Sequence, residues 1–599
     1  MSDERNSHKS LHRWAVFFGV AILAGFVYTV CVYVSLLVNE RDKYLNVIQS
    51  NEVKMFEKRG RRGNIYDCRG RLISASLPEY EIYMDLTVDY NQKGAGRDSF
   101  PARLERLCQQ LSARFGEETQ EHLYRRLMTS YRRNDKRRND HGVRLLNRIL
   151  SFEEMQEVLQ MPLLNMSPSC GGLVVKERSN RENLFGGMAN RVIGAVYGSD
   201  DTTHLRLGRY GIEQSMDREL SGTKGVYVRQ RVGGKRIAEP IVQAIDGCDV
   251  VLTLDMDMQD VCECALRERL AVSGARSAFM ILMEVETGEI KAMANLTQEK
   301  PGVIAQGTNM ALAMNNQPGS TFKTVCLMAA LETGECDSAT VLLVNGGHDK
   351  FSGEDVYDSH FYPEKYLPLS AVMARSSNVG MARLMETVYG KNRAAWREFS
   401  EDIDKLGYDD SIPIEIIGSA RPVIHRYGEY EEWSGNTMTG MSRGYGVQSS
   451  ALYTLNFYNA IANDGYYVQP HLVSALRRGG EFVKEFDVVR SRSRMCSRGT
   501  LEQVRAMLEG VVNRPDGTAY RFASSELFPV AGKTGTARYE MVNGEWKYQI
   551  SFVGYFPADK PRYSAIVVLM CPDKAYTGMY CGGVFREVAE TVWSMDQAR

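Results

Sequence analysis

The stretch Asn316-Gln317-Pro318-Gly319-Ser320-Thr321-Phe322-Lys323, followed by the apolar run 324–331, decides the fold and the site of this chain. Pro318-Gly319 is typical of a turn, so the pattern predicts a helix that begins at Ser320 and is buried beyond it. Residues three apart share a helix face, and we therefore expect Ser320 and Lys323 to lie within hydrogen-bonding distance. Burial would lower the pKa of Lys323, which lets the amine accept the serine proton. The stretch predicts a nucleophilic serine with its own lysine base.

Length and composition limit the function classes. A chain of 599 residues is too long for one core and predicts two to four domains. The balance of 73 basic and 74 acidic residues argues against a partner made of nucleic acid. The 12 cysteines have no repeated spacing and the 9 histidines are scattered, so we expect no structural zinc site. Neither a metal nor a cofactor is expected.

Residues 14–38 form an uncharged segment that is long enough to span a bilayer as a helix. Trp14 at its start is typical of an interfacial anchor. No small-residue cleavage signature follows, so we expect a retained signal-anchor, with residues 1–13 as a cytoplasmic tail and the rest outside the membrane. In that oxidising compartment the cysteines are expected to pair, in a pattern that the sequence leaves open.

Residues 39–239 are predicted to form a non-catalytic module. Its start, 40–58, has helical character and suggests a stalk. The stretch 59–72 reads as a basic loop and a short strand pair turning at Arg69-Gly70, although its arginines are also suited to anionic lipid heads. Polar helices are expected over 100–162, with a charge run at 131–140 that favours a solvated face or a docking surface. The Gly-rich part 171–224 predicts an extended region with little helix.

Residues 240–599 are predicted to form a second domain. Strands are expected at 249–254, in a hairpin over 278–294, and again at 548–556 and 563–570. Helices dominate from 318 to about 465, and 584–595 closes the chain as a helix. Strands at both ends with helices between them predict one sheet built from distant sequence, which is an α+β domain.

A Ser-x-x-Lys spacing alone is weak evidence, because Ser221-Gly222-Thr223-Lys224 repeats it. That copy lies between glycines with no apolar helix after it, so we interpret it as a loop. Ser376-Ser377-Asn378 falls between two helical segments, where a hydroxyl and an amide two residues apart can point into one cleft. Ser434-Gly435-Asn436 has the same pattern in a polar loop and is the lesser candidate. Taken alone, each pattern is equally consistent with a helix-joining turn.

The third candidate segment is Lys533-Thr534-Gly535-Thr536, which begins a strand that turns back at Asn543-Gly544. Gly535 allows close approach of another backbone. The lysine and the two threonine hydroxyls would make an anion site that suits a carboxylate. The segment alone is equally consistent with an ordinary strand start, but all three motifs in this order are far rarer.

That ordered set is the signature of penicillin-binding proteins and serine β-lactamases. The chain resembles the class B, monofunctional penicillin-binding transpeptidases. The resemblance extends through most of the chain: Arg59-Gly60-x-x-Gly63-Asn64-Ile65-Tyr66-Asp67, with Cys68 where the family has arginine; Ala189 to Gly194; Gly208 to Gly222; and Leu252 to Gln259. Arg443-Gly444-Tyr445-Gly446 with Ala462 to Gly465 is more similar to the division-type members.

The resemblance implies a fold and a mechanism. The fold would be α+β, with one transmembrane helix, an extended pedestal (dimerisation-like) module and a transpeptidase domain with a central antiparallel sheet. The enzyme would sit in the bacterial inner membrane with its N-terminus inside. Its partners would be peptidoglycan stem peptides, β-lactams, a membrane glycosyltransferase and other division proteins. The implied roles are: nucleophile, Ser320; base, Lys323; proton relay, Ser376; substrate amide contact, Asn378; carboxylate site, Lys533, Thr534 and Thr536; oxyanion hole, the N–H groups of Ser320 and Thr536.

Other functions stay open at this point. The same site would serve a D,D-carboxypeptidase or a β-lactamase, but no residue can be assigned to activate water. An elongation-type transpeptidase is another alternative, because the similarity to the division-type members rests on few residues. A membrane-anchored sensor or scaffold with an inactive catalytic fold is the alternative outside enzymes, and it would be expected to show decay in at least one motif.

Overall fold

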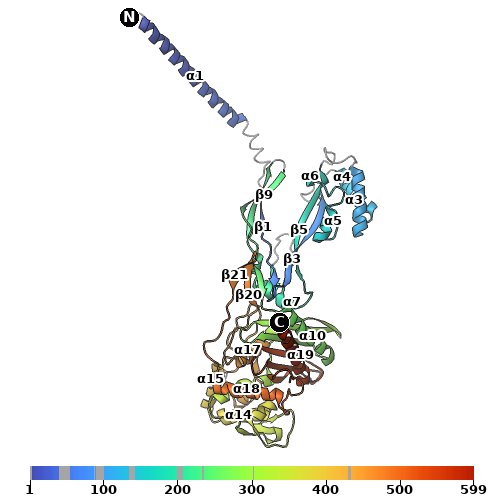
Figure 1. The fold of residues 1–599 in the computed structure, drawn as a ribbon, viewed down its shortest axis with the longest axis vertical. Helices are drawn as coiled ribbons and strands as arrows, with labels where there is room; N and C mark the ends of the chain where they lie inside the picture. The colour runs from blue at the N-terminus through green and yellow to red at the C-terminus, as the bar shows by residue number, and fades with distance from the viewer. Residues whose placement is uncertain are drawn as a thin grey trace. The chain divides into compact units, whose positions relative to one another are not determined.

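The computed structural model describes residues 3–39, 54–86, 88, 100–133, 142–197, 207–232, 235–300, 302–428 and 433–598. The chain divides into two compact units. One comprises Met1–Arg61 with Gly222–Asp246, and the other comprises Arg62–Ser221 with Gly247–Arg599 (Figure 1).

The first unit contains a long helix and a small sheet. Helix α1 (Asp3–Asn39) includes the apolar segment Val16–Ser35, which is long enough to cross a membrane. Strands β1 (Lys54–Arg59), β8 (Lys224–Val232) and β9 (Lys235–Val242) form an antiparallel sheet in the order β1-β8-β9. The helical stalk predicted for 40–58 is wrong over its last five residues, because they pair with β8 as a strand. Residues 40–53 lie outside the described residues.

The second unit begins with a sheet-and-helix module. The long strands β3 (Leu72–Met84) and β5 (Leu173–Asn183) pair antiparallel, and the short β4 (Val143–Arg144) adds to β3. The polar helices predicted over 100–162 are present, and their apolar faces share a buried core with Ile82 and Met84 of β3. Their bounds are α3 Phe100–Phe115, α4 Gln120–Arg133 and α5 Phe152–Val158. Most of the charge run at 131–140 lies outside the described residues.

The Gly-rich part is less extended than expected. Besides β5, its described residues contain short helices, the first of which ends at Gly171, and the small strand pair β6 (Ala195–Val196) and β7 (Gly208–Tyr210). The helices are α6 Pro168–Gly171, α7 Asn190–Ile193, α8 Gly211–Ser215 and α9 Asp217–Ser221. Arg62, from the preceding basic stretch, lies among the last of these helices: it ion-pairs with Glu213 and Asp217, both at 2.7 Å. The guanidinium of Arg62 is therefore paired with carboxylates inside the fold.

One sheet joins segments that are distant in sequence. Its strand order is β21-β20-β10-β2-β3-β4, with β5 also paired to β3. Strand β2 (Ile65–Tyr66) runs parallel to β10 (Asp249–Leu252), and β10 runs antiparallel to β20 (Val473–Arg478). The last strand is β21 (Glu481–Glu485). The predicted short strand pair at 65–72 is confirmed as β2 and the start of β3, which turn at Arg69-Gly70.

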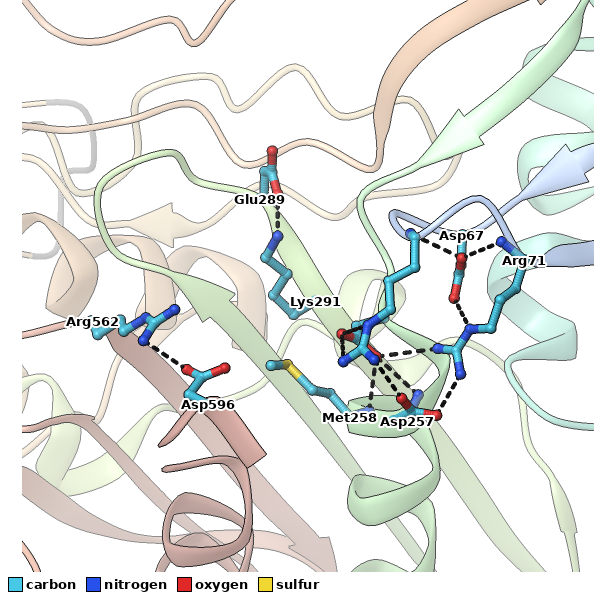
Figure 2. A network of polar contacts seen from close by, with 10 residues as sticks. Asp67, Arg71, Asp257, Met258, Glu289, Lys291, Arg562 and Asp596 are labelled. Atoms are coloured by element: carbon cyan, nitrogen blue, oxygen red, sulfur yellow. Dashed lines mark hydrogen bonds and ion pairs between the residues drawn. The ribbon is translucent and has the colours of Figure 1, made fainter. Parts of the chain in front are cut away.

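A polar network holds the β2–β3 turn against helix α10 (Met256–Ser273) (Figure 2). Asp67 is fully buried and accepts a hydrogen bond from Arg71 Nε at 2.6 Å, while the same guanidinium contacts Asp257. Arg69 pairs with Asp255 at 2.9 Å, and Asp255 also caps the helix N-terminus. Cys68 replaces an arginine of the family pattern, and the neighbouring Arg69 and Arg71 supply the ion pairs of this turn.

The six-stranded antiparallel sheet of the second unit has the order β13-β12-β11-β24-β23-β22. It joins strands from both ends of the predicted domain, as expected. The bounds are β11 Ser277–Glu284, β12 Ile290–Lys300, β13 Val303–Gln306, β22 Ala531–Val542, β23 Glu545–Phe556 and β24 Tyr563–Met570. Asn543-Gly544 forms the predicted hairpin turn with both φ angles positive, which matches the twist of the strands it joins. Strand β22 lies at the edge of this sheet.

Helices cover both faces of the sheet. Successive side chains of a strand point to opposite faces. Accordingly, Ala278, Met280 and Leu282 of β11 join the core under α10 and α19 (Gly583–Gln597), whereas Phe279, Ile281 and Met283 join the larger core on the other side. The larger core contains the buried helices α12 (Lys323–Glu332) and α17 (Ala451–Ala462).

The remaining elements of this unit lie between β13 and the C-terminal helix α19 in sequence. They are α11 Met310–Ala313, η1 Gly319–Thr321, β14 Val341–Leu343, η2 Asn345–Gly347, β15 His348–Phe351, β16 Glu354–Tyr357, β17 Tyr366–Pro368, α13 Leu369–Ala374, α14 Asn378–Tyr389, α15 Arg393–Lys405, β18 Val423–Ile424, α16 Gly435–Met441, β19 Val447–Gln448, α18 Arg498–Asn513 and η3 Gly578–Gly582.

The cysteine pairing expected from the sequence is not found for the buried cysteines. Cys108, Cys262 and Cys326 are thiols, and each lies in a different hydrophobic core. Thiols that are separated in this way cannot approach to the distance that a disulfide bond requires.

Candidate active site

Ser320 lies on a tight turn at the start of a buried helix. The turn η1 spans Gly319–Thr321, and α12 follows from Lys323 with every residue up to Leu331 buried. Gly319 has φ +59°, and a Cβ there would lie 2.5 Å from the carbonyl oxygen of Thr536. Only glycine fits both conditions. The predicted turn and helix are confirmed, and the turn is packed directly against strand β22.

Lys323 is fully buried below this turn. Its Nζ donates to the carbonyl oxygen of Ser376 at 2.5 Å and to Asn378 Oδ1 at 2.8 Å, and it lies 3.3 Å from Ser376 Oγ. Burial lowers the pKa of Lys323 to about 7, with the charge of Asp358 opposing this shift and that of Arg443 adding to it. The amine is therefore available as a base near neutral pH.

The expected hydrogen bond between Ser320 and Lys323 is not formed among the described residues, because the amine is directed toward the segment 376–378 instead. Ser320 itself is only partly buried, so its hydroxyl is within reach of a ligand. Catalytic hydrogen bonds commonly tighten only when substrate is bound, and the arrangement is consistent with that behaviour.

Ser376-Ser377-Asn378 forms the predicted junction between α13 and α14. Ser376 adopts φ +55°, a left-handed conformation that is uncommon for serine. Ser377 caps α14, and its Oγ accepts from the N–H of Gly380 at 2.9 Å. The strained turn presents Ser376 and Asn378 on the same side, where both meet Lys323.

The third segment reaches the same point from the sheet edge. Lys533, fully buried in β22, donates to Ser376 Oγ at 2.7 Å. The Ser376 hydroxyl therefore lies between two lysines. Burial, with the nearby charge of Lys323, lowers the pKa of Lys533. The structure thus brings the three predicted motifs together around one hydroxyl group.

The threonines of β22 are held by partners that the sequence did not identify. Thr534 Oγ1 lies 2.9 Å from Thr518 Oγ1, and Thr536 Oγ1 lies 2.7 Å from Thr577 Oγ1. Between them, a Cβ on Gly535 would lie 2.4 Å from Ser551 Oγ. The predicted close approach at this glycine is therefore present.

Asp358 is a further residue that sequence reasoning missed. Its carboxylate accepts from Ser377 Oγ at 2.6 Å, from the N–H of Val379 at 2.9 Å, and from the N–H of Asn378 and the hydroxyl of Tyr362. One carboxylate thus fixes the turn that carries Ser376 and Asn378. The only signal for it in the sequence is an acidic residue 18 positions before Ser376, which is too general to single it out.

A cleft of about 1200 Å³ opens beside these motifs. Asn378 lines it, as do Gln317 from the segment before Ser320 and Arg538 from β22. Aromatic and charged side chains form much of the remaining wall, among them Tyr357, Trp433, Tyr445 and Trp546, with Glu354, Asp355 and Arg443. The cleft has the size and polarity to hold an extended peptide.

The two other motifs with matching spacing, at 221–224 and 434–436, make contacts that stabilise the structure. Ser221 accepts from Arg62 at 2.8 Å, and Lys224 pairs with Glu57 at 2.6 Å on an exposed surface. Lys224 is therefore solvated, as predicted. Ser434 belongs to a capping box with Thr437 at the start of α16, and Asn436 lines the cleft wall without contact to Lys323.

Two family models match the chain. The penicillin-binding protein transpeptidase domain matches residues 278–590, and the penicillin-binding protein dimerisation domain matches residues 57–252. Among solved structures, penicillin-binding protein 2X of Streptococcus thermophilus is similar over 91% of this chain and 80% of that one, with TM-score 0.73 and 18% identity. That likeness shows the fold.

Curated relatives agree with the family models. PbpB of Mycobacterium tuberculosis is 30% identical over 66% of this chain, and PenA of Neisseria meningitidis is 29% identical over 63%. The matched regions cover 59% and 62% of the lengths of those two relatives. FtsI of Escherichia coli is 26% identical over 69% of this chain and 66% of that one. The chain belongs to the class B penicillin-binding proteins, which join a dimerisation domain to a transpeptidase domain.

Proposed function

We propose that this protein is a peptidoglycan D,D-transpeptidase that crosslinks stem peptides through an acyl-enzyme on Ser320, with release of D-alanine. The observation that carries the proposal is the convergence of Lys323, Ser376 and Lys533 beside Ser320. FtsI of Escherichia coli, to which the chain is similar, bears the name peptidoglycan D,D-transpeptidase, which supports the same activity.

Acylation would begin with proton transfer from Ser320 to the neutral amine of Lys323. Oγ then attacks the carbonyl carbon between the two terminal D-alanines. The N–H groups of Ser320 and Thr536 would bind the oxyanion, each contributing on the order of 3 kcal/mol to the transition state. The tight packing of Gly319 on Thr536 supports this pairing. The C–N bond breaks as Ser376 relays a proton to the leaving amine.

The donor peptide would lie along the free edge of β22. An edge strand presents unpaired N–H and C=O groups that an extended peptide can bind. Lys533, Thr534 and Thr536 would hold the terminal carboxylate, and the Asn378 amide would bond the peptide. Burial lowers the pKa of Lys533, and an arriving carboxylate would favour its charged form again.

The apolar helix and the family support a proposed cellular setting. Helix α1 fits a single-pass anchor. In our proposal the N-terminus lies in the cytoplasm, and the catalytic domain works outside the inner membrane, in septal wall synthesis. A membrane glycosyltransferase and other division proteins are the proposed partners. β-Lactams resemble the donor terminus and would acylate Ser320 in its place.

The decisive experiment uses the detergent-solubilised full chain and a labelled β-lactam. We expect a long-lived acyl-enzyme that peptide mapping places on Ser320. Ser320→Ala should remove the label and leave the melting temperature unchanged. Rapid turnover of the label would instead identify a carboxypeptidase or a β-lactamase.

A second experiment addresses the scaffold alternative. In cells that depend on this chain, Ser320→Ala should block septation although the protein is present at its normal level. Normal division with the variant would refute the enzymatic role. Localising a fluorescent fusion to the septum or to the side wall would separate division from elongation.

A further inference from the structure

Arg443 is fixed beside the turn that carries the nucleophile. The next residue, Gly444, has φ +80°, and a Cβ there would lie 1.9 Å from the carbonyl oxygen of Gly319. Arg443 Nε donates to the carbonyl oxygen of Thr439 at 3.0 Å, and the side chain is only 11% exposed. Its guanidinium lies 5.7 Å from the centroid of the Tyr445 ring. The position of this cation is therefore determined by the turn before Ser320.

Glu354 faces Arg443 from the start of β16. The two carboxylate oxygens lie 3.4 and 3.3 Å from Nη2 of Arg443, and the glutamate side chain is 46% exposed. Charge-assisted hydrogen bonds between such groups are usually about 2.7–2.9 Å long. The ion pair between Arg443 and Glu354 is therefore longer than usual. Both residues line the cleft that also contains Asn378.

The loosely paired guanidinium of Arg443 and carboxylate of Glu354 complement a ligand that carries both a negative and a positive charge. A carboxylate can bind Arg443, while an ammonium group on the same carbon can bind Glu354. Of the two substrates of the proposed crosslinking reaction, the acceptor is the one whose amine reacts at the acyl-enzyme. We propose that Arg443 and Glu354 select the acceptor, favouring an amine that carries a carboxylate on the same carbon. This inference rests on the proposed function, since it names the acceptor class of the same site.

The transfer step balances with groups already present. The ammonium loses one proton to the neutral amine of Lys323, and the resulting amine nitrogen forms a bond to the acyl carbon. The ester bond to Ser320 Oγ breaks, and the second proton of the nitrogen passes to that oxygen. An amide crosslink and free Ser320 result, and Lys323 releases the proton that it took up. Arg443 and Glu354 act by positioning the acceptor.

Asp355 provides a matched control. It lines the same cleft and carries the same charge, but it pairs with His348 at 2.9 Å and lies 3.7 Å from Lys350. Its carboxylate is therefore engaged on the hairpin of β15 and β16. Asp355→Asn removes one negative charge from the cleft without touching Arg443.

The experiment compares two acceptors that differ only in the carboxylate. The solubilised full chain is acylated by a thioester donor, and D-alanine or D-alaninamide competes with water for the acyl-enzyme. We expect the wild type to prefer D-alanine about tenfold, as one charge-assisted hydrogen bond would give. Arg443→Gln should abolish this preference. Glu354→Gln should weaken transfer to both amines about equally, and Asp355→Asn should change neither.

Two readouts separate this inference from the proposed function. Labelling by a β-lactam reports acylation alone and should persist in Glu354→Gln and Asp355→Asn. Binding of the two amines to Ser320→Ala, measured by saturation-transfer NMR, needs no turnover and should favour D-alanine until Arg443→Gln is added. Equal binding of the two amines to Ser320→Ala would overturn the inference, as would an unchanged preference in Arg443→Gln. Loss of labelling in the wild type would refute only the proposed function.

Discussion

The carboxylate of Asp358 accepts a hydrogen bond from the hydroxyl of Ser377 at 2.6 Å, and this contact fixes the turn on which Ser376 and Asn378 stand. The same carboxylate also receives the N–H groups of Asn378 and Val379 at the start of α14. A negative charge is favourable at a helix N-terminus. Asp358 therefore acts through other residues, as a positioning group.

Asp358→Asn is expected to slow acylation because it removes the charge that four donors share. Hydrogen bonds to charged groups contribute about 1.5–3 kcal/mol each, so a loss of about tenfold or more in the second-order rate constant is expected. Stopped-flow measurements with a labelled β-lactam would test this. A positioning role predicts that Asp358→Glu restores part of the rate, and an Asp358→Asn variant with the wild-type rate would contradict it.

The rate of acylation should depend on pH through Lys323. The pKa of this buried lysine is lowered to about 7, so the neutral base is lost as pH falls below that value. The rate should fall about tenfold per pH unit below pH 6 and reach a plateau above pH 8. A profile measured with a neutral β-lactam that is flat from pH 5 to 8 would exclude Lys323 as the base.

The same shift predicts a pH dependence of stability. Between pH 7 and about 10 the unfolded chain holds a proton on Lys323 that the folded chain does not, so stability should rise with pH in this window. Lys323→Met keeps the volume of the side chain and removes the proton, so it should reduce this slope. Denaturant unfolding at a series of pH values gives the comparison.

Gly535→Ala should impair both folding and labelling. The new methyl group would lie 2.4 Å from Ser551 Oγ and 2.9 Å from Thr321 Cγ2, in the residue next to Ser320. Overpacking of this kind costs about 1–3 kcal/mol. The control is Gly499→Ala in α18, where a Cβ meets nothing within 4 Å and stability should be unchanged or slightly raised. Equal effects of the two substitutions on melting temperature would contradict this account.

Glu213→Ala should strongly destabilise the protein. Glu213 is 1% exposed and pairs with Arg62 at 2.7 Å and with Arg181 at 2.5 Å. Its removal takes this carboxylate away from the buried guanidinium of Arg181, while Arg62 keeps its ion pair with Asp217. Breaking a buried pair in this way typically costs about 3–5 kcal/mol. Glu157→Ala breaks the exposed pair with Arg114 and should have no measurable effect on unfolding by urea.

The sequence predicts those parts of the fold whose signals are local. The turn at Pro318-Gly319, the buried helix after it and the hairpin at Asn543-Gly544 depend on neighbouring residues, and the structure has all three. Residues 54–58 form a strand where the sequence predicts a helical stalk. The partner strand begins 170 residues later, at Lys224, so no local pattern reveals the pairing.

The sequence predicts the site residues that belong to recognisable motifs. Ser320, Lys323, Ser376 and Lys533 belong to spacings with a chemical rationale, and they meet in space. Asp358, Thr518 and Thr577 belong to none, because each acts through contacts with residues that are distant in sequence. The direction of the Lys323 amine was also beyond sequence reasoning, since it depends on the left-handed backbone of Ser376.

The pairing of β2 with β10 has a practical consequence for dissecting this protein. The backbone of β10 is bonded on one side to a strand near residue 65 and on the other to a strand near residue 475. A recombinant fragment that starts at residue 240 would keep the second neighbour and lose the first, leaving a bare strand edge open to self-association. Fragments of the catalytic part should therefore carry residues 62–86 as well, so that main-chain pairing on both sides of β10 is kept.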